Sequence, residues 1–340
     1  MHARTHDFNN LGDFARSVRA AANGTTDKRL MAAATTYGNE ATGSQGGFAV
    51  PPEFADQIYA TLDGEQSLMT YCHPMEIGSN RLELPSDESP AWGTTGVHCS
   101  WESEGVVLTQ LKPELKDNQL NLSRLKALVP VTDELDNDSP ALADWLTWRF
   151  GEAIRWKMND AILDGDGNGK PLGILNAPAT LTVSKVAGQA AGTILGANIL
   201  GMYQRLLASS QVGAVWVANP DSLINLASVN LENGAPAYIA NNGQGAPGGY
   251  LLGRPVIFTE AGKAIGTRGD IVLADLSTYI LAKRRGDPSI AHSIHLWFDQ
   301  DVNAYRIIFR ADGQPLLHAP VTPPNSAVTR STCVALETRA

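Results

Sequence analysis

The longest helical pattern in the chain is Ser139–Leu163, which reads SPALADWLTWRFGEAIRWKMNDAIL. Its first two residues are of the types preferred at a helix N-cap and at the first helical position. Core packing is the simplest interpretation of Trp145, Trp148 and Trp156. We therefore predict one long helix that packs on more than one side. Large apolar side chains recur along it every four residues, as expected for a core-facing stripe: Leu142, Leu146, Phe150, Ile154, Met158 and Ile162.

A glycine-rich turn follows this helix. Residues 164–171 read DGDGNGKP, and Asp164, Asp166 and Asn168 match the first half of a calcium loop, in which alternating oxygen ligands surround one cation. The twelfth position of such a loop needs a bidentate carboxylate but is Leu175 here. The favoured interpretation is a turn that ends the helix, and these three residues are the candidates if a metal binds.

Upstream of the helix, residues 76–118 form an acidic excursion with alternating strand-like runs such as Arg81–Pro85. The pattern predicts a long β-hairpin. A polar segment of this length buries itself poorly, so we expect it to be functional, disordered or packed on another molecule. It has three basic residues, Arg81, Lys112 and Lys116, against eight acidic ones: Glu76, Glu83, Asp87, Glu88, Glu102, Glu104, Glu114 and Asp117.

The rest of the chain alternates between short helices and strands. The N-terminal segment shows one amphipathic helical pattern, followed by a polar stretch at 32–47 that we interpret as a flexible arm. Downstream, the pattern predicts a compact mixed α/β unit and then a hairpin. The expected elements are strands at 120–131, 214–218, 256–259 and 271–274, helices at 197–208 and 219–229, and paired strands at 292–298 and 304–310.

Composition narrows the function classes. The 340 residues are 43% hydrophobic and 18% charged with a net charge of −9, which fits a globular protein and argues against a sequence-reading DNA binder. Cys72, Cys99 and Cys333 give neither a disulfide framework nor a zinc motif, and fit a reducing compartment. No signal peptide or membrane-spanning run is evident, so we expect a soluble protein made in a cytoplasm.

Motifs that would carry catalysis are not convincing. Residues 243–248 match G-x-G-x-x-G, but no strand leads into them and Pro247 disfavours a following helix. No G-x-S-x-G occurs, and none of the cysteines lies in a nucleophile signature. The basic run at 283–285 is more typical of a solvated loop than of a nucleic-acid site. We therefore predict no catalytic residues and no cofactor.

Taken in order, several short segments resemble the major capsid proteins of tailed bacteriophages with the HK97-like shell fold. Their order and spacing carry the resemblance, since no single segment is specific. They are Gly46–Pro51, Trp101-Glu102, Val131–Leu135 with Asp138, Gly165–Gly167 with Pro171–Leu175, Val217–Pro220 and Leu252–Val256.

The resemblance implies an α+β, HK97-like capsid fold with an N-terminal arm, an extended β-hairpin (E-loop), a peripheral domain with a long spine helix, and an axial α/β domain. Its expected divisions are an N-terminal helix and arm at 1–47, a first peripheral part at 48–75, the E-loop at 76–118, the main peripheral part at 119–178 with the spine helix at 139–163, the axial domain at 179–290, a peripheral hairpin at 291–319 and a C-terminal segment at 320–340.

The implied function is that of a major capsid protein without enzymatic activity. Copies would assemble through pentamers and hexamers into an icosahedral shell that encloses viral double-stranded DNA without reading its sequence. Expected partners are other copies, a portal protein, a separate scaffolding protein and, as a further candidate, a decoration protein, with no membrane partner. The expected location is the virion, after assembly in the host cytoplasm. The candidate intersubunit residues are Pro51, Arg81, Trp101, Glu102, Lys112 and Lys116.

Two departures from the family and two alternatives remain open. Only about forty-five residues precede Gly46, so scaffolding would come from a separate protein or from this short segment, or would not be needed. Some relatives crosslink a loop lysine to an asparagine, but the strand at 304–310 has no asparagine and only Asn303 lies nearby. The alternatives are an encapsulin-like nanocompartment shell and a metal-dependent α/β enzyme that uses the loop at 164–169.

Overall fold

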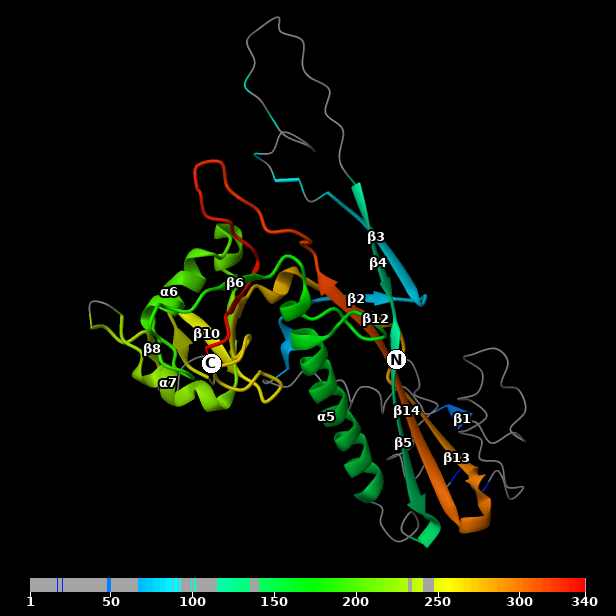
Figure 1. Ribbon diagram of the computed structural model, residues 1–340. Helices are drawn as coiled ribbons and strands as arrows, with labels where there is room; N and C mark the ends of the chain where they lie inside the picture. The colour runs from blue at the N-terminus through cyan, green and yellow to red at the C-terminus, as the bar shows by residue number, and fades with distance from the viewer. Residues whose placement is uncertain are drawn as a thin grey trace, which may run out of the picture. The chain divides into compact units, whose positions relative to one another are not determined.

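The computed structural model describes residues 17, 20, 48–49, 67–87, 89–90, 92, 99, 101, 115–134, 141–231, 234–240 and 248–339 (Figure 1). The chain divides into two units. The first contains residues 1–67, 122–157 and 283–311, and the second contains residues 68–121, 158–282 and 312–340. Both units are therefore assembled from segments that are distant in the sequence.

The predicted long helix is α5, Ala141–Asp164. Its buried side chains keep the predicted four-residue spacing at Leu146, Phe150, Ile154 and Met158. The three tryptophans differ from the prediction, because Trp145, Trp148 and Trp156 are 53%, 50% and 46% exposed. At 100° per residue they lie on the side of the helix opposite the buried stripe, so core packing does not explain them.

The first unit also contains an antiparallel sheet with strands in the order β1, β13, β14, β5. The bounds are β1 Phe48–Ala49, β5 Ser123–Thr132, β13 Ser289–Trp297 and β14 Val302–Pro315, whose last four residues belong to the second unit. Strands β13 and β14 form the predicted hairpin, with His292 opposite Tyr305. The turn between them contains the short helix η8, Phe298–Gln300, and Asp301 in the left-handed conformation.

The second unit is built on a seven-stranded sheet in the order β6, β15, β11, β7, β10, β9, β8. Its strands are β6 Leu181–Val183, β7 Val215–Ala218, β8 Tyr238–Ile239, β9 Tyr250–Leu251, β10 Arg254–Phe258, β11 Ile271–Ala274 and β15 Cys333–Leu336. The predicted strands at 214–218, 256–259 and 271–274 are therefore confirmed as β7, β10 and β11. The sequence did not predict that β15 would lie inside this sheet.

Helices accompany this sheet. They are α6 Gly196–Gln204 and α7 Leu223–Ser228, with the short 3-10 helices η4 Ile174–Asn176, η5 Ala208–Gln211, η6 Pro220–Ser222 and η7 Leu276–Thr278. The helix predicted at 197–208 ends earlier, at Gln204. The reason is backbone pairing, since Leu206 bridges Ser331 and the amide of Leu207 donates to the Ser331 carbonyl.

The remaining strands of the second unit include the predicted acidic hairpin. Strands β3, Arg81–Asp87, and β4, Leu115–Asn121, pair antiparallel from Arg81 opposite Asn121 to Asp87 opposite Leu115. The unit also holds η3 Leu68–Thr70, β2 His73–Ile77 and β12 Tyr279–Arg284, whose last two residues belong to the first unit. The prediction of a hairpin in residues 76–118 is thus confirmed at its paired base.

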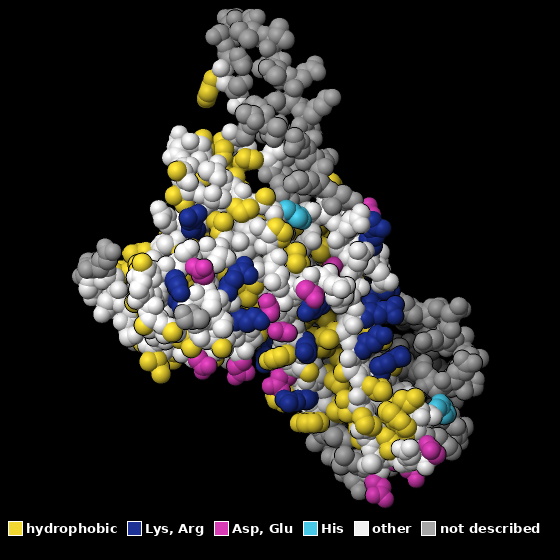
Figure 2. Space-filling view, viewed as in Figure 1, with side chains coloured by type: hydrophobic (Ala, Val, Ile, Leu, Met, Phe, Trp, Pro, Cys, Tyr) yellow, Lys and Arg dark blue, Asp and Glu magenta, His cyan; other side chains and the backbone are white. Residues whose placement is uncertain are grey.

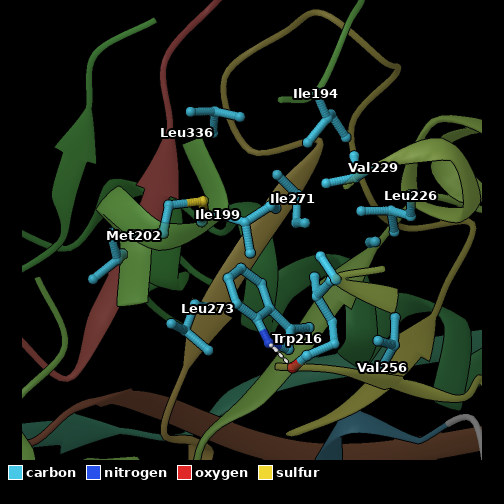
Figure 3. Close-up of a cluster of buried hydrophobic side chains, with 14 of the residues drawn as sticks. Ile194, Ile199, Met202, Trp216, Leu226, Val229, Val256, Ile271, Leu273 and Leu336 are labelled. Atoms are coloured by element: carbon cyan, nitrogen blue, oxygen red, sulfur yellow. Dashed lines mark hydrogen bonds between the residues drawn. The ribbon is translucent and has the colours of Figure 1, made fainter. Parts of the chain in front are cut away.

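Trp216 lies at the centre of the second unit's core (Figure 3). It is fully buried on β7, and its indole nitrogen donates to the Leu251 carbonyl at 3.0 Å. Satisfying this N–H is what allows a tryptophan to be fully buried. The surrounding side chains include Ile199 and Met202 of α6, Leu226 of α7, Val256 of β10, Ile271 and Leu273 of β11, and Val334 and Leu336 of β15.

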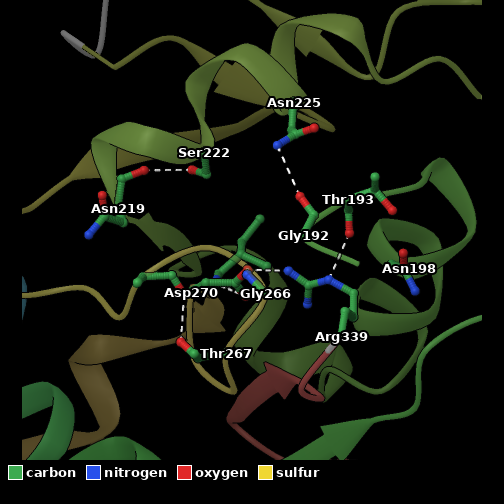
Figure 4. A network of polar contacts seen from close by, with 12 residues as sticks. Gly192, Thr193, Asn198, Asn219, Ser222, Asn225, Gly266, Thr267, Asp270 and Arg339 are labelled. Carbon is green, nitrogen blue, oxygen red and sulfur yellow. Dashed lines mark hydrogen bonds and ion pairs between the residues drawn. The ribbon is translucent and has the colours of Figure 1, made fainter. Parts of the chain in front are cut away.

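A buried ion pair holds the segment that follows β15 (Figure 4). The Arg339 guanidinium pairs with Asp270, and both side chains are fully buried. Arg339 Nε also donates to the Thr193 carbonyl at 2.7 Å, and the backbone amide of Arg339 donates to Gly266 at 2.7 Å. Asp270 accepts in addition from the Gly266 amide at 2.9 Å. Three distant segments are therefore fixed at one point.

The two faces of α5 give a stability test. Phe150→Ala empties a buried position and should lower the free energy of unfolding by about 3–5 kcal/mol. Trp148→Ala removes a half-exposed ring and should cost about 1–2 kcal/mol. Urea denaturation followed by circular dichroism measures both. Equal losses for the two variants would mean that the tryptophan face is also packed within the subunit.

The buried ion pair gives a second test. Arg339→Met leaves the Asp270 carboxylate buried without its cation and should destabilise the second unit by about 3–5 kcal/mol. Arg268→Met is the matched control, because Arg268 is partly exposed and its Nε donates to Thr182 Oγ1 at 3.1 Å. Hydrogen exchange at the β15 amides is the readout. Unchanged protection in Arg339→Met would show that the pair does not hold β15.

Candidate functional site

The hairpin β3–β4 is the most prominent candidate surface. At its base the Asn121 amide donates to Asp312 Oδ2 at 2.8 Å, and burial raises the pKa of the Asp312 carboxyl. Asn118 and Leu120 are buried, which anchors β4 in the second unit. The paired strands end at Asp87 and Leu115. The subunit therefore fixes the base of the hairpin, while residues 88–114 connect its two strands.

Two tryptophans of this connection can be placed. The indole nitrogen of Trp92 donates to the Thr322 carbonyl at 3.2 Å. Trp101 is 105% exposed, so the described part of the chain leaves its ring open to solvent. Exposing the large apolar ring of a tryptophan to water is unfavourable, and burial against a partner surface would remove this cost. Trp101 is therefore the strongest single indication of an intermolecular contact in the hairpin.

The other predicted contact residues are less well placed. Arg81 is an exposed residue of β3 and pairs with Glu83 at 2.8 Å. Lys116 lies on β4 opposite Ser86, and only its backbone position is described. Pro51, Glu102 and Lys112 lie outside the described residues. The structure thus brings Arg81 and Lys116 onto one hairpin and leaves the grouping of all six residues a prediction.

The exposed tryptophan face of α5 is a second candidate surface, which the sequence analysis did not predict. Figure 2 shows hydrophobic side chains along this part of the first unit. Charged side chains flank the rings: Arg149 pairs with Glu152, and Lys157 Nζ lies 4.9 Å from the ring centre of Trp156. Its sequence signal was the spacing of Trp145, Trp148 and Trp156, which places them within one narrow sector of the helix.

The predicted metal candidates form a helix-terminating turn. Asp164 forms an ion pair with Lys263. Asp166 lies 3.6 Å from Lys170 and accepts from the Asn168 amide at 3.1 Å; this amide hydrogen bond, followed by the Lys170 charge, lowers the pKa of Asp166. Across the part of the chain that the structure describes, no three His, Cys, Asp or Glu residues gather as metal ligands would. The carboxylates are thus engaged by cations and amides of the chain itself.

Glycines explain the composition of this turn. Gly167 and Gly169 have φ values of +74° and +70°, which favour glycine. A Cβ atom on Gly173 would lie 2.3 Å from the Gly165 amide nitrogen, so the chain can only close here without a side chain. These glycines therefore allow the tight turn that follows α5, and a turn that ends the helix is what the sequence predicted.

Asn303, the asparagine nearest to the strand considered for crosslinking, is buried. Its side-chain amide donates to Asp133 Oδ1 at 3.2 Å, within the first unit. This pairing ties the start of β14 to the residue that follows β5. Within the described residues, no helix combines the length and the apolar character needed to cross a membrane.

The cysteines yield a test of the second unit. Burial raises the pKa of Cys72 and of Cys333 from 9.0 to about 12, whereas Cys99 is exposed. At pH 8 an aromatic disulfide reagent should label Cys99 quickly and the other two only after unfolding. Because the folded state holds these two protons more tightly, stability should fall as pH rises from about 9 through about 12. Rapid labelling of all three thiols in the native protein would contradict this burial.

Comparison with known proteins identifies the family. A model of the Phage capsid family matches residues 46–325. Comparison with curated protein sequences finds no match. Among solved structures, the capsid of a native GTA particle aligns with a TM-score of 0.64 and 18% identity, covering 82% of this chain and 91% of that one.

Two further solved structures align similarly. One carries the name Mycobacterium phage Cain, with a TM-score of 0.56, 16% identity and coverage of 79% of this chain and 89% of that one. The other is the holo-SrpI encapsulin complex from Synechococcus elongatus, with a TM-score of 0.54, 11% identity and coverage of 79% and 86%. These likenesses confirm the HK97-like α+β fold, and the family match over most of the chain confirms the resemblance seen in the sequence. The chain belongs to the Phage capsid family and is a structural, non-enzymatic protein of the virion capsid.

Proposed function

We propose that this major capsid protein assembles through pentamers and hexamers into an icosahedral shell that encloses viral double-stranded DNA without sequence-specific contacts. The family match supports the shell, and the acidic balance of the chain suits a container for a packed polyanion. In such a shell each subunit contacts several neighbours, so stability comes from many moderate contacts.

The hairpin β3–β4 carries this proposal, and we assign it the role of the E-loop. Its base is anchored in the second unit through Asn118, Leu120 and the bond from Asn121 to Asp312. Beyond the base, Trp101 is fully exposed, and the segment 76–118 has a net charge of −5 from eight acidic and three basic residues. A segment of this kind gains most by lying across a neighbouring subunit. Pro51, Arg81, Trp101, Glu102, Lys112 and Lys116 are the proposed contacts.

The remaining assignments follow the same family plan. Helix α5 would be the spine helix of the peripheral domain, residues 179–290 the axial domain and residues 1–47 the arm. A portal protein, a separate scaffolding protein and a decoration protein are the proposed partners, and assembly would take place in the host cytoplasm.

An encapsulin-like shell is the second candidate, because the Synechococcus encapsulin shares the fold. The contents of purified particles separate the two. Nuclease-protected DNA in particles from infected or induced cells supports the viral capsid, whereas a protein cargo without nucleic acid supports the nanocompartment.

The first experiment is electron microscopy of the purified protein expressed alone, with its mass measured by light scattering. Closed shells, or rings of five and six subunits, would support the proposal. A monomer or dimer that persists after addition of the scaffolding protein would overturn it.

Excising residues 88–114 tests the role of the hairpin. Joining Asp87 to Leu115 through an Asn-Gly turn keeps the β3–β4 pairing and should leave a folded subunit. We expect normal circular dichroism and the loss of stable shells, because the segment that reaches the neighbour is gone. Trp101→Ala should weaken assembly in the same direction, whereas Trp92→Ala changes a ring already tied to Thr322 and serves as the control. Normal shells from the excised chain would refute the intersubunit role.

A further inference from the structure

The strands of the second unit's sheet end on two opposite sides of the sheet. We name each side by the direction of the strands, as follows. Strand β10 runs parallel to β7, and β11 is antiparallel to both β7 and β15, so β7, β10 and β15 all point the same way. The residues that precede these three strands therefore lie along one side, here called the amino edge. The residues that follow β7 and β10 lie along the opposite side, here called the carboxyl edge.

The amino edge combines an exposed aliphatic side chain with arginines. Val212, just before β7, is 81% exposed. Arg254 opens β10, and its Nη1 donates to the Val212 carbonyl at 2.9 Å. Arg330 precedes β15, and Arg205 lies beside it, because the Ser331 amide donates to the Arg205 carbonyl at 3.0 Å. The amino edge therefore combines basic side chains with one exposed aliphatic side chain, Val212.

The carboxylate at the amino edge does not cancel this charge at the surface. Asp275 follows β11 and thus lies at the same side, but it is buried. Its Oδ1 accepts from the Ser277 amide at 3.2 Å and from the Ser277 hydroxyl at 2.6 Å. The arginines consequently dominate the charge that a partner would meet.

The carboxyl edge has the opposite character. Ile224 is 82% exposed, and Asp221 and Glu260 are exposed acidic residues that follow β7 and β10. Asn219 joins their loops, since its Oδ1 accepts from the Asp221 amide at 3.0 Å and its Nδ2 donates to the Gly262 carbonyl at 2.8 Å. Figure 2 shows acidic side chains on the rim of the second unit where Figure 1 places α7.

Two cations on the carboxyl side are already engaged. Lys263 forms the ion pair with Asp164. Arg268 lies on the β6 side of the sheet, where its Nε donates to Thr182 Oγ1. Among the described residues that follow β7 and β10, Asp221 and Glu260 therefore carry the exposed negative charge.

We propose that the amino edge of one copy docks against the carboxyl edge of the next copy around a ring. The inference rests on the proposed function and adds the two surfaces and their chemistry. A ring formed by a heterologous contact needs two different, complementary patches on each subunit. The amino edge offers an aliphatic side chain among arginines, and the carboxyl edge offers an aliphatic side chain beside carboxylates. In the docked pair Val212 packs beside Ile224, and the arginines face Asp221 and Glu260.

Charge reversal tests the contact. The amino-edge variant carries Arg205→Glu, Arg254→Glu and Arg330→Glu, so both of its edges become acidic. The carboxyl-edge variant carries Asp221→Arg and Glu260→Arg, so both of its edges become basic. Each variant alone should lose at least about tenfold in assembled material, because every contact then joins like charges. Combining all five substitutions in one chain restores complementarity and should restore assembly.

Mixing the two variants gives a sharper outcome. Each contact is then attractive only between unlike variants, so the two must alternate around a ring. Rings of six can alternate, whereas rings of five cannot. Electron microscopy of the mixture should show six-membered rings, and sheets or tubes made of them, without closed shells.

The outcomes of these assembly experiments distinguish a failure of this inference from a failure of the proposed function. Wild-type protein that fails to assemble, even with its scaffolding protein, counts against the proposed function. Wild-type protein that assembles, together with a folded carboxyl-edge variant that assembles equally well, overturns this inference alone. The amino-edge variant loses the bond from Arg254 to the Val212 carbonyl and could fold less well for that reason. The carboxyl-edge variant is the deciding one, because Asp221 and Glu260 are both exposed. Closed shells from the mixture would also overturn it.

Discussion

The buried pair between Arg339 and Asp270 is the interaction on which the second unit depends. One guanidinium bonds to a carboxylate beside β11 and to the Thr193 carbonyl ahead of α6, while its own backbone fixes the segment after β15. Strand β15 lies between β6 and β11, so the sheet would be split without it. A fully buried charge pair is tolerated only when its hydrogen bonds are complete, and here they are supplied by backbone groups from separate segments.

Local patterns in the sequence predicted most elements of the fold. Four-residue spacing predicted α5, a proline beside Asn219 predicted the start of a helix, and alternation predicted the hairpins. Strand β15 was missed because four residues carry little periodic signal and its partners, Leu181 to Val183 and Val272 to Ala274, are distant in sequence. The orientation of the tryptophans was misread for a different reason. Apolar residues occur on several faces of α5, so their periodicity alone did not show that the tryptophan face points away from the core.

The candidate site was predictable only in outline. The acidic composition and the alternating runs of residues 76–118 predicted a hairpin, and the paired base of β3 and β4 confirms it. Single contact residues were harder to choose, because the local sequence does not say which exposed side chains are already paired. Arg81 pairs with Glu83, whereas the ring of Trp101 is fully exposed. The composition of the two edges requires the sheet topology, because Arg254, Arg330 and Glu260 reach the ends of β7 only through the pairing and direction of other strands.

Since β3 and β4 are paired up to Asp87 and Leu115, the length of the connection between them is independent of the subunit's core. Insertions and deletions at this point change the reach of the segment without refolding the protein that carries it. The same property makes the tip of this hairpin a natural place to graft foreign peptides, which a shell of many copies would display at high density. In evolution, the sequence and length of this one loop can therefore change to fit new neighbours, while the packing of the core constrains the rest of the chain.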